Sequence, residues 1–271
     1  MKPIILSLSI TLLFVSSLTL LSQNSGNPKS TPPSKLAEEK WISLFNGKNL
    51  EGWIPKVAKS KVGENTLDVF RVEDGILKVS YDKYDKFDSR FGHLFYKDKL
   101  SSYKLRLEYR FSGKLLTDAP SYCYRNSGVM IHSQSPESME LDQNWPVSIE
   151  AQLLGSTDSL KQFTANVCTP GTTVYFQDKF TDEHCISSNS KNYPDGEWVK
   201  LEIVVHGSKV IHHIVNGDTV LTYSKPQVGG FLVPEHYALP EGTILKDGYI
   251  ALQAEGTPID FRKIELLKLP D

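Results

Sequence analysis

NSGVMIH, residues 126–132, and PVSIEAQLLG, residues 146–155, are the two stretches that decide the fold of this chain. In both, apolar residues alternate with polar ones, as expected of β-strands, whose side chains point to opposite faces with a period of two. The apolar face would hold Val129, Ile131, Ile149, Ala151 and Leu153. The other face would hold Met130, His132, Glu150 and Gln152.

The segment YIALQAEG, residues 249–256, repeats this pattern, with Ile250, Leu252 and Ala254 opposite Gln253 and Glu255. KLRLEYRF, residues 104–111, alternates in the same way and sets Arg106, Glu108 and Arg110 opposite an apolar face. We expect all these polar groups to line one concave cleft, while their apolar neighbours form the core.

Short strands joined by tight turns make up the rest of the chain. Asn216-Gly217 and Asp74-Gly75 are dipeptides typical of two-residue β-hairpin turns. No segment of ten or more residues after the N-terminal region shows a helical period. The pattern predicts an all-β sandwich, or jelly roll, with a concave polar cleft.

The N-terminus has the features of an export signal. Lys2 precedes an apolar run, residues 4–21, that has no acidic residue. We expect a signal peptide at 1–22, a flexible linker at 23–40 and one domain at 41–271, exported to the periplasm or secreted; an uncleaved membrane anchor is the alternative. The mature part has no run long enough to span a bilayer. Its charges nearly balance, with 30 Lys and Arg against 32 Asp and Glu, which argues against a nucleic-acid partner.

Export makes the cysteines interpretable. Cys168 and Cys185 bracket a short segment, and a disulfide between them is stable outside the cytoplasm. Cys123 would then stay unpaired. A metal site built from Cys168, Cys185 and His184 is less favoured, because a second close-spaced ligand pair is missing.

The chain resembles the 3-keto-disaccharide hydrolase domain family of the concanavalin A-like superfamily. WISLFNGKNLEGW, residues 41–53, is similar to the family's opening signature. Further family landmarks follow in order, namely Asp74-Gly75 with Leu77, Asn126 to Gly128, Glu150 with Gln152, Gly196 with Trp198, Asn216-Gly217, Gly248 to Gln253, and Phe261 to Ile264. The resemblance covers residues 44–269 and implies a concanavalin A-like sandwich that acts on oxidised sugars.

Two positions depart from the family pattern. His132 stands where many members have Arg, and Thr169 to Thr172 replaces a Gly-x-x-Tyr turn. Both bear on which substrate the site accepts.

The implied substrate defines the chemistry. A ketone at C3 of a sugar acidifies the C2 hydrogen, so a base can form an enolate and the glycosidic oxygen can leave from C1, after which water adds. This route needs a base and a group that stabilises the enolate. We expect His132 as base with Glu150 orienting it or holding a metal, or the two roles exchanged. Arg262, or a divalent cation (Ca²⁺, Mn²⁺ or Zn²⁺) held by His132, Glu150 and Gln152, would stabilise the enolate.

The remaining polar groups are candidate substrate ligands. These candidates are Tyr124, Asn126, Gln152, Gln253, Glu255 and Arg262. Tyr122 and Tyr124 are suited to stacking on a sugar ring, and Arg262 has a structural ion pair as its alternative role. Two rival functions remain. A conventional glucanase is disfavoured because residue 152 is Gln where such enzymes carry a second acid, and a non-catalytic carbohydrate-binding module fits the sandwich equally well.

Overall fold

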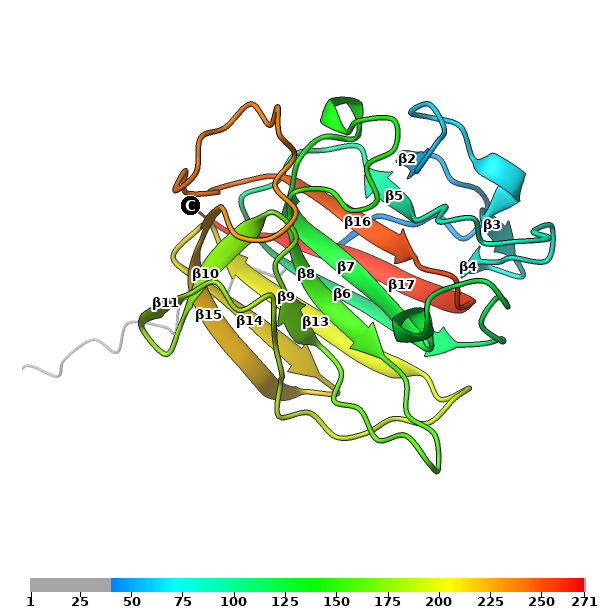
Figure 1. Ribbon diagram of the computed structural model, residues 1–271. Helices are drawn as coiled ribbons and strands as arrows, with labels where there is room; N and C mark the ends of the chain where they lie inside the picture. The colour runs from blue at the N-terminus through cyan, green and yellow to red at the C-terminus, as the bar shows by residue number, and fades with distance from the viewer. Residues whose placement is uncertain (1–39, 271) are drawn as a thin grey trace, which may run out of the picture. The chain divides into compact units, whose positions relative to one another are not determined.

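The computed structural model describes residues 40–270 and contains two antiparallel β-sheets (Figure 1). The predicted signal peptide (1–22) and linker (23–40, apart from its last residue) lie outside the described residues and stay predictions. Three single-turn 3-10 helices, η1 (Thr66–Asp68), η2 (Ser121–Cys123) and η3 (Pro136–Ser138), are the only helices in this range. No helical segment among residues 40–270 is long and apolar enough to cross a membrane.

The first sheet has ten strands, ordered β11-β10-β15-β14-β13-β6-β17-β4-β3, with β1 paired to β17. Its strands are β1 (Ile42–Ser43), β3 (Phe70–Glu73), β4 (Ile76–Val79), β6 (Ser102–Phe111), β10 (Thr172–Phe176), β11 (Lys179–Thr181), β13 (Val199–His206), β14 (Val210–Val215), β15 (Asp218–Val228) and β17 (Ile259–Lys268). Both predicted hairpins occur in it: β14 turns into β15 at Asn216-Gly217, and β3 into β4 at Asp74-Gly75. All four turn residues have positive φ.

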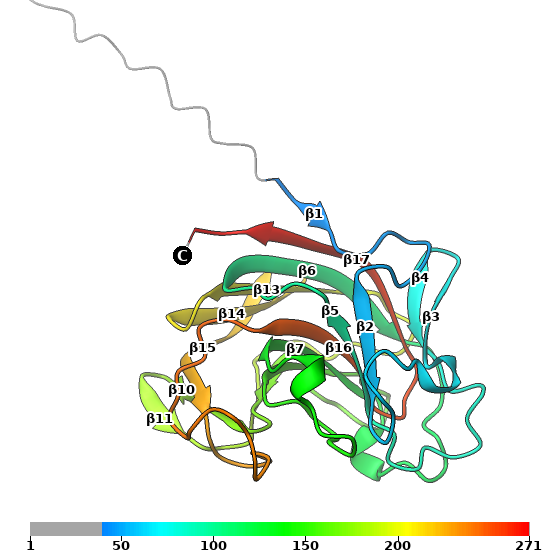
Figure 2. The same cartoon turned by 90° about the horizontal axis from the view of Figure 1, so that it is seen from above.

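The second sheet has seven strands, ordered β12-β9-β8-β7-β16-β5-β2. Its strands are β2 (Trp53–Val57), β5 (Gly92–Tyr96), β7 (Asn126–Ser133), β8 (Ile149–Leu154), β9 (Asn166–Cys168), β12 (Cys185–Ile186) and β16 (Tyr249–Ala254). Figure 2 shows the two layers from above, with β6 and β17 in one and β7 and β16 in the other. This arrangement confirms the predicted all-β sandwich of two sheets.

The core fills the space between the sheets. Every apolar side chain predicted for the inner face of β7, β8 and β16 belongs to it, Val129, Ile149 and Leu252 among them. From the ten-stranded sheet it receives residues such as Leu105, Ile203 and Phe261. Alternation therefore assigned the buried face of these strands correctly.

The polar residues of β6 do not join the cleft, and this expectation was wrong. Strand β6 belongs to the ten-stranded sheet, so its outward face looks away from the seven-stranded one. Glu108 pairs there with Arg262 and Lys263, and Arg110 with Asp260. A period of two separates the faces of a strand, but it does not say which sheet the strand joins.

Candidate active site

A cavity of about 660 Å³ lies over the outer face of the seven-stranded sheet. Its floor comes from β7, β8 and β9. The loops around these strands, the long loop before β16 and Glu255 just after β16 form its walls. Polar side chains in the lining are Asn126, Glu150, Gln152, Gln162, His184 and Glu255. Apolar and aromatic ones are Tyr122, Trp145, Leu154, Pro170, Phe231 and Leu232, beside the Cys168–Cys185 disulfide. This combination of hydrogen-bonding groups and aromatic faces suits a sugar.

Strand register places the polar residues of the floor side by side. Gln152 of β8 lies between Gly128 of β7 and Asn166 of β9, and Asn166 Nδ2 donates to Gln152 Oε1 over 3.0 Å. The Asn126 side chain donates to the Tyr122 carbonyl and leaves its own Oδ1, a buried atom, without a partner. Gln152 is thus fixed in orientation, and Asn126 Oδ1 is free to accept a hydrogen bond from a ligand.

Glu150 is the carboxyl group at the centre of the floor. It is 6 % exposed. Burial raises the pKa of Glu150 to about 8, since a charged carboxylate loses its hydration there. A buried carboxyl group with a raised pKa in a cavity is a candidate base.

Glu255 provides a second carboxyl group in the same cavity. It follows β16, is 4 % exposed, and accepts a hydrogen bond from the Trp145 side chain. Burial is the main cause that raises the pKa of Glu255 well above its usual range, and repulsion from the Glu150 charge is the second. When two buried carboxyl groups repel each other in this way, one ionises while the other keeps its proton.

Gln253 lies on the same face as Glu255 but does not line the cavity. Its amide is fully buried, and neither its nitrogen nor its oxygen has a partner among the described residues. The residue opposite it on β5, His93, is equally buried, with both ring nitrogens unpaired. Burial, with a smaller contribution from the charge of Lys56, lowers the pKa of His93 to about 3, so this ring is neutral. Alternation within GHLFY (92–96) could have placed His93 on this face.

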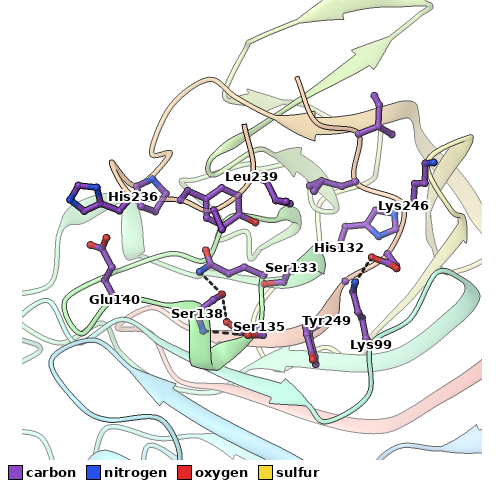
Figure 3. A pocket seen from close by; sticks show the side chains of 18 residues that line it. Lys99, His132, Ser133, Ser135, Ser138, Glu140, His236, Leu239, Lys246 and Tyr249 are labelled. Carbon is purple, nitrogen blue, oxygen red and sulfur yellow. Dashed lines mark hydrogen bonds and ion pairs between the residues drawn. The ribbon is translucent and has the colours of Figure 1, made fainter. Parts of the chain in front are cut away.

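His132 is not beside Glu150, so the expected convergence of these two residues is not found. Between the pairs Tyr249–Ser133 and Ala251–Met130, β16 advances by two residues and β7 by three, so β7 carries a β-bulge. His132 has φ 47° within it, and its Nε2 lies 3.0 Å from the carbonyl oxygen of Gly207, a residue of the β13–β14 turn. The ring lines a different cavity, shown in Figure 3. Period-two alternation stops at a bulge, which explains the error.

Two other predicted ligands also lie elsewhere. Arg262 is on β17, where it pairs with Glu108 and stacks 3.9 Å from the centre of the Trp198 ring, the structural role named as its alternative. Tyr124 lies under the Arg125 guanidinium and does not line the cavity, whereas Tyr122 does.

The disulfide between Cys168 and Cys185 is present, as predicted, and joins β9 to β12. It holds His184 at the cavity wall, where Nδ1 is buried without a partner and the ring meets Phe231 edge-on. Burial lowers the pKa of His184, and a contact with the Thr169 backbone partly offsets this effect. Four residues that line the cavity were not predicted from the sequence, namely His184, Trp145, Gln162 and Phe231. All four lie outside the strands, so alternation gave no signal.

The predicted metal ligands do not fit a metal. His132 lines a different cavity from Glu150 and Gln152. Among residues 40–270, no three His, Cys, Asp or Glu side chains gather in a geometry that could hold an ion. We therefore derive no step through a divalent cation.

Comparison with known proteins gives a family match and agrees with the fold. The sequence profile of a family described as the 3-keto-alpha-glucoside-1,2-lyase-like domain matches residues 40–267. Two solved structures from Parabacteroides distasonis, both provisionally assigned as glycosyl hydrolases, share the fold with a TM-score of 0.51. One is 17 % identical over 86 % of this chain and 95 % of its own, the other 20 % over 85 % and 100 %. No curated protein matches the sequence significantly.

Proposed function

Because this chain belongs to the 3-keto-α-glucoside-1,2-lyase-like domain family, we propose that it cleaves the glycosidic bond of a 3-keto-glycoside with Glu150 as the base. The observation that carries the proposal is the pair of buried carboxyl groups, Glu150 and Glu255, in one cavity. Burial raises the pKa of both carboxyl groups, and their mutual repulsion lets only one of them ionise at a time. We assign the charge to Glu150 and the proton to Glu255.

These two states supply what an elimination needs. The Glu150 carboxylate removes the proton from C2, and the electron pair moves into the C3 carbonyl as an enolate. The protonated Glu255 donates a hydrogen bond to developing negative charge, which is most effective in a site that excludes water. As the enolate collapses, a C1–C2 double bond forms and the C1–O bond breaks, and the leaving oxygen takes the proton that Glu150 removed from C2. Water then adds across the C1–C2 double bond, its hydroxyl to C1 and its hydrogen to C2, and gives the free 3-keto sugar.

The rest of the lining would hold the sugar in place. Asn126 Oδ1 and the fixed Gln152 amide can bind hydroxyl groups on the floor. Trp145 and Tyr122 offer aromatic faces to a sugar ring. The leaving group would lie toward Phe231, which is 61 % exposed at the cavity mouth. Such positioning contributes to catalysis by holding C2 against the base.

The experiment separates proton abstraction from bond cleavage. Purified protein is incubated in D₂O with a 3-keto-glucoside, and deuterium at C2 and the released aglycone are both measured. We expect the wild type to give both, Glu150→Gln to give neither, and Glu255→Gln to be slowed in both. Glu202→Gln, which removes a carboxylate from the other sheet, is the matched control and should behave as wild type.

Three outcomes would contradict the proposal. Undiminished exchange and cleavage in Glu150→Gln would remove this residue as the base. Sugar binding by the wild type without exchange or cleavage would instead identify a non-catalytic carbohydrate-binding domain. Cleavage of the unoxidised glycoside at the same rate would point to a conventional glycosidase.

We also propose that the protein acts after export, in the periplasm or outside the cell. The Cys168–Cys185 disulfide supports this, because such bonds persist in oxidising compartments, and so does the apolar N-terminal run. Cell fractionation, with mass spectrometry of the mature N-terminus, tests it. Full-length protein retained in the cytoplasm would contradict it.

A further inference from the structure

A second cavity, of about 850 Å³, lies where β7 ends and β16 begins (Figure 3). Its walls are the loop that follows β7 and residues 234–248 of the long loop before β16. Neither Glu150 nor Glu255 lines it. The same long loop contributes Phe231 and Leu232 to the first cavity, so it borders both. The proposed reaction makes no use of this second cavity.

Two adjacent side chains in its lining carry buried polar atoms without partners. His132 and Ser133 are each 2 % exposed, and neither His132 Nδ1 nor Ser133 Oγ has a hydrogen-bond partner among residues 40–270. Buried polar atoms are nearly always paired, so these two are suited to meeting a polar group that enters the cavity. His132 is held at a positive φ, and such strained backbone often occurs at functional sites.

The contact between His132 Nε2 and Gly207 determines the tautomer of the ring, and with it the kind of group that Nδ1 can bind. Nε2 faces a carbonyl oxygen, that of Gly207, and must therefore carry the hydrogen and donate it. Burial lowers the pKa of His132, an effect that the Gly207 contact and the charge of Asp247 only partly offset, so the ring is neutral. A neutral ring protonated at Nε2 has a lone pair at Nδ1. The group that meets it must be a donor, and the Ser133 hydroxyl beside it can donate or accept.

One wall of the cavity, the loop that follows β7, is held by its own hydrogen bonds. The Gln134 amide donates to Ser138 Oγ over 3.0 Å, and its oxygen accepts from the Val147 backbone over 2.7 Å. Ser138 Oγ in turn donates to the Ser135 carbonyl. These polar groups are therefore engaged within the protein, unlike His132 Nδ1 and Ser133 Oγ.

The charges of the cavity cancel. Lys99 pairs with Asp247 over 2.7 Å. The lining has one further lysine, Lys246, and one further acid, Glu140, so its positive and negative charges are equal in number. Such a lining has no net preference for an anion or a cation. Tyr237, Tyr249 and Leu239 add flat apolar surface. A neutral ligand rich in hydroxyl groups fits this combination, because each hydroxyl can donate and accept and a sugar ring can pack on tyrosine.

We propose that this cavity is a second saccharide site, which binds a neutral mono- or disaccharide through a hydroxyl that donates to His132 Nδ1 and a hydroxyl that pairs with Ser133 Oγ. The proposal does not depend on the reaction assigned to the first cavity. It assigns the His132 ring to ligand binding and to no catalytic step.

Titration with unoxidised cellobiose and maltose tests the proposal, by calorimetry and by the ¹⁵N shifts of the histidine rings. We expect millimolar binding and a change at His132 Nδ1. Glu150→Gln should bind as wild type does, because it alters only the first cavity. Ser133→Ala should weaken binding about fivefold, the effect of one lost hydrogen bond. Thr222→Ala, a hydroxyl deletion on β15, is the matched control and should leave the disaccharide affinity unchanged.

A further variant keeps the test valid if Ser133→Ala fails to fold. Ala238→Trp places a large ring at an exposed position of the wall and should abolish binding while leaving the melting temperature unchanged. Binding that Glu150→Gln removes and Ser133→Ala spares would place the sugar in the first cavity and overturn the proposal. Absence of binding by either disaccharide, or binding unaffected by Ala238→Trp, would overturn it as well. None of these results depends on whether the protein cleaves 3-keto-glycosides.

Discussion

Gly128 of β7 lies directly against the Glu150 carboxyl group of β8, so closely that a Cβ atom on Gly128 would stand 2.3 Å from Glu150 Oε1. Gly128 has no positive φ that would demand glycine. Its role is therefore to leave room, and the space that a side chain would occupy holds the carboxyl group instead. The relationship explains why a glycine stands within a strand, where it otherwise weakens the sheet.

Replacing Gly128 by Ala should reduce activity more than stability. The added methyl group must displace the Glu150 side chain, and a shift of about 1 Å in a reacting group costs about a hundredfold in rate. We expect kcat to fall by this order, as measured by aglycone release. Gly92→Ala, whose added methyl group would press on Phe70 in the core, is the control and should lower the melting temperature with little change in kcat.

The rate should depend on pH in a bell-shaped manner. Because burial raises the pKa of Glu150 to about 8, the base becomes active as pH rises through that value. Activity should fall again at higher pH as Glu255 loses its proton, since burial and the Glu150 charge raise the pKa of Glu255 well above its usual range. A profile of kcat/KM against pH checks both limbs. A flat profile between about pH 5 and pH 7 would contradict the assignment, since an ordinary carboxylate is already ionised there.

Ionisation of Glu150 should make the protein less stable as the pH rises, although it makes the enzyme more active. The folded protein keeps this proton up to about pH 8, whereas the unfolded chain releases it near the usual pKa of 4.5. In that interval the folded state binds more protons, so raising the pH lowers the free energy of unfolding. Glu150→Gln removes the penalty. Thermal melts should therefore show a variant that gains stability over wild type between about pH 5 and pH 9, and a constant difference would argue against burial of an ionisable group.

Reduction of the disulfide should damage both stability and the site. The bond closes a loop of sequence separation 17, which on chain-entropy grounds contributes about 3 kcal/mol. Cys185→Ser should lower the melting temperature accordingly. It should also raise KM, because His184 and β12 lose their attachment at the cavity wall. Cys123→Ser, which alters the buried free cysteine, serves as the comparison and should leave KM unchanged.

Removing Arg262 should affect folding and spare catalysis. Its guanidinium binds Glu108 and stacks on Trp198, on the outer face of the ten-stranded sheet. We expect Arg262→Ala to lower the free energy of unfolding by about 1 kcal/mol, the range of partly exposed ion pairs. The kcat/KM should stay within about twofold of wild type. A much larger loss of kcat/KM at full stability would mean that Arg262 reaches the substrate.

The sequence by itself determined the faces of the strands, and with them part of the site. Glu150, Gln152 and Glu255 reach the cavity because alternation along β8 and β16 is regular up to these residues, and the Asn-Gly and Asp-Gly turns follow from local backbone preference. Both properties depend on neighbours in the chain, so local patterns are sufficient to predict them. The Cys168–Cys185 pairing was predictable for a similar reason, since the two residues lie close in sequence.

Only the tertiary structure decided which strands share a sheet, where alternation breaks, and which loops reach the cavity. Arg262 and Glu108 belong to the ten-stranded sheet. The bulge in β7 directs His132 toward the second cavity, and loops place Trp145 and His184 at the first. These outcomes depend on contacts between residues far apart in the chain. Glu150 and Glu255 are 105 positions apart by their numbers, and their coupling arises because β7 alone separates β8 from β16 in the sheet.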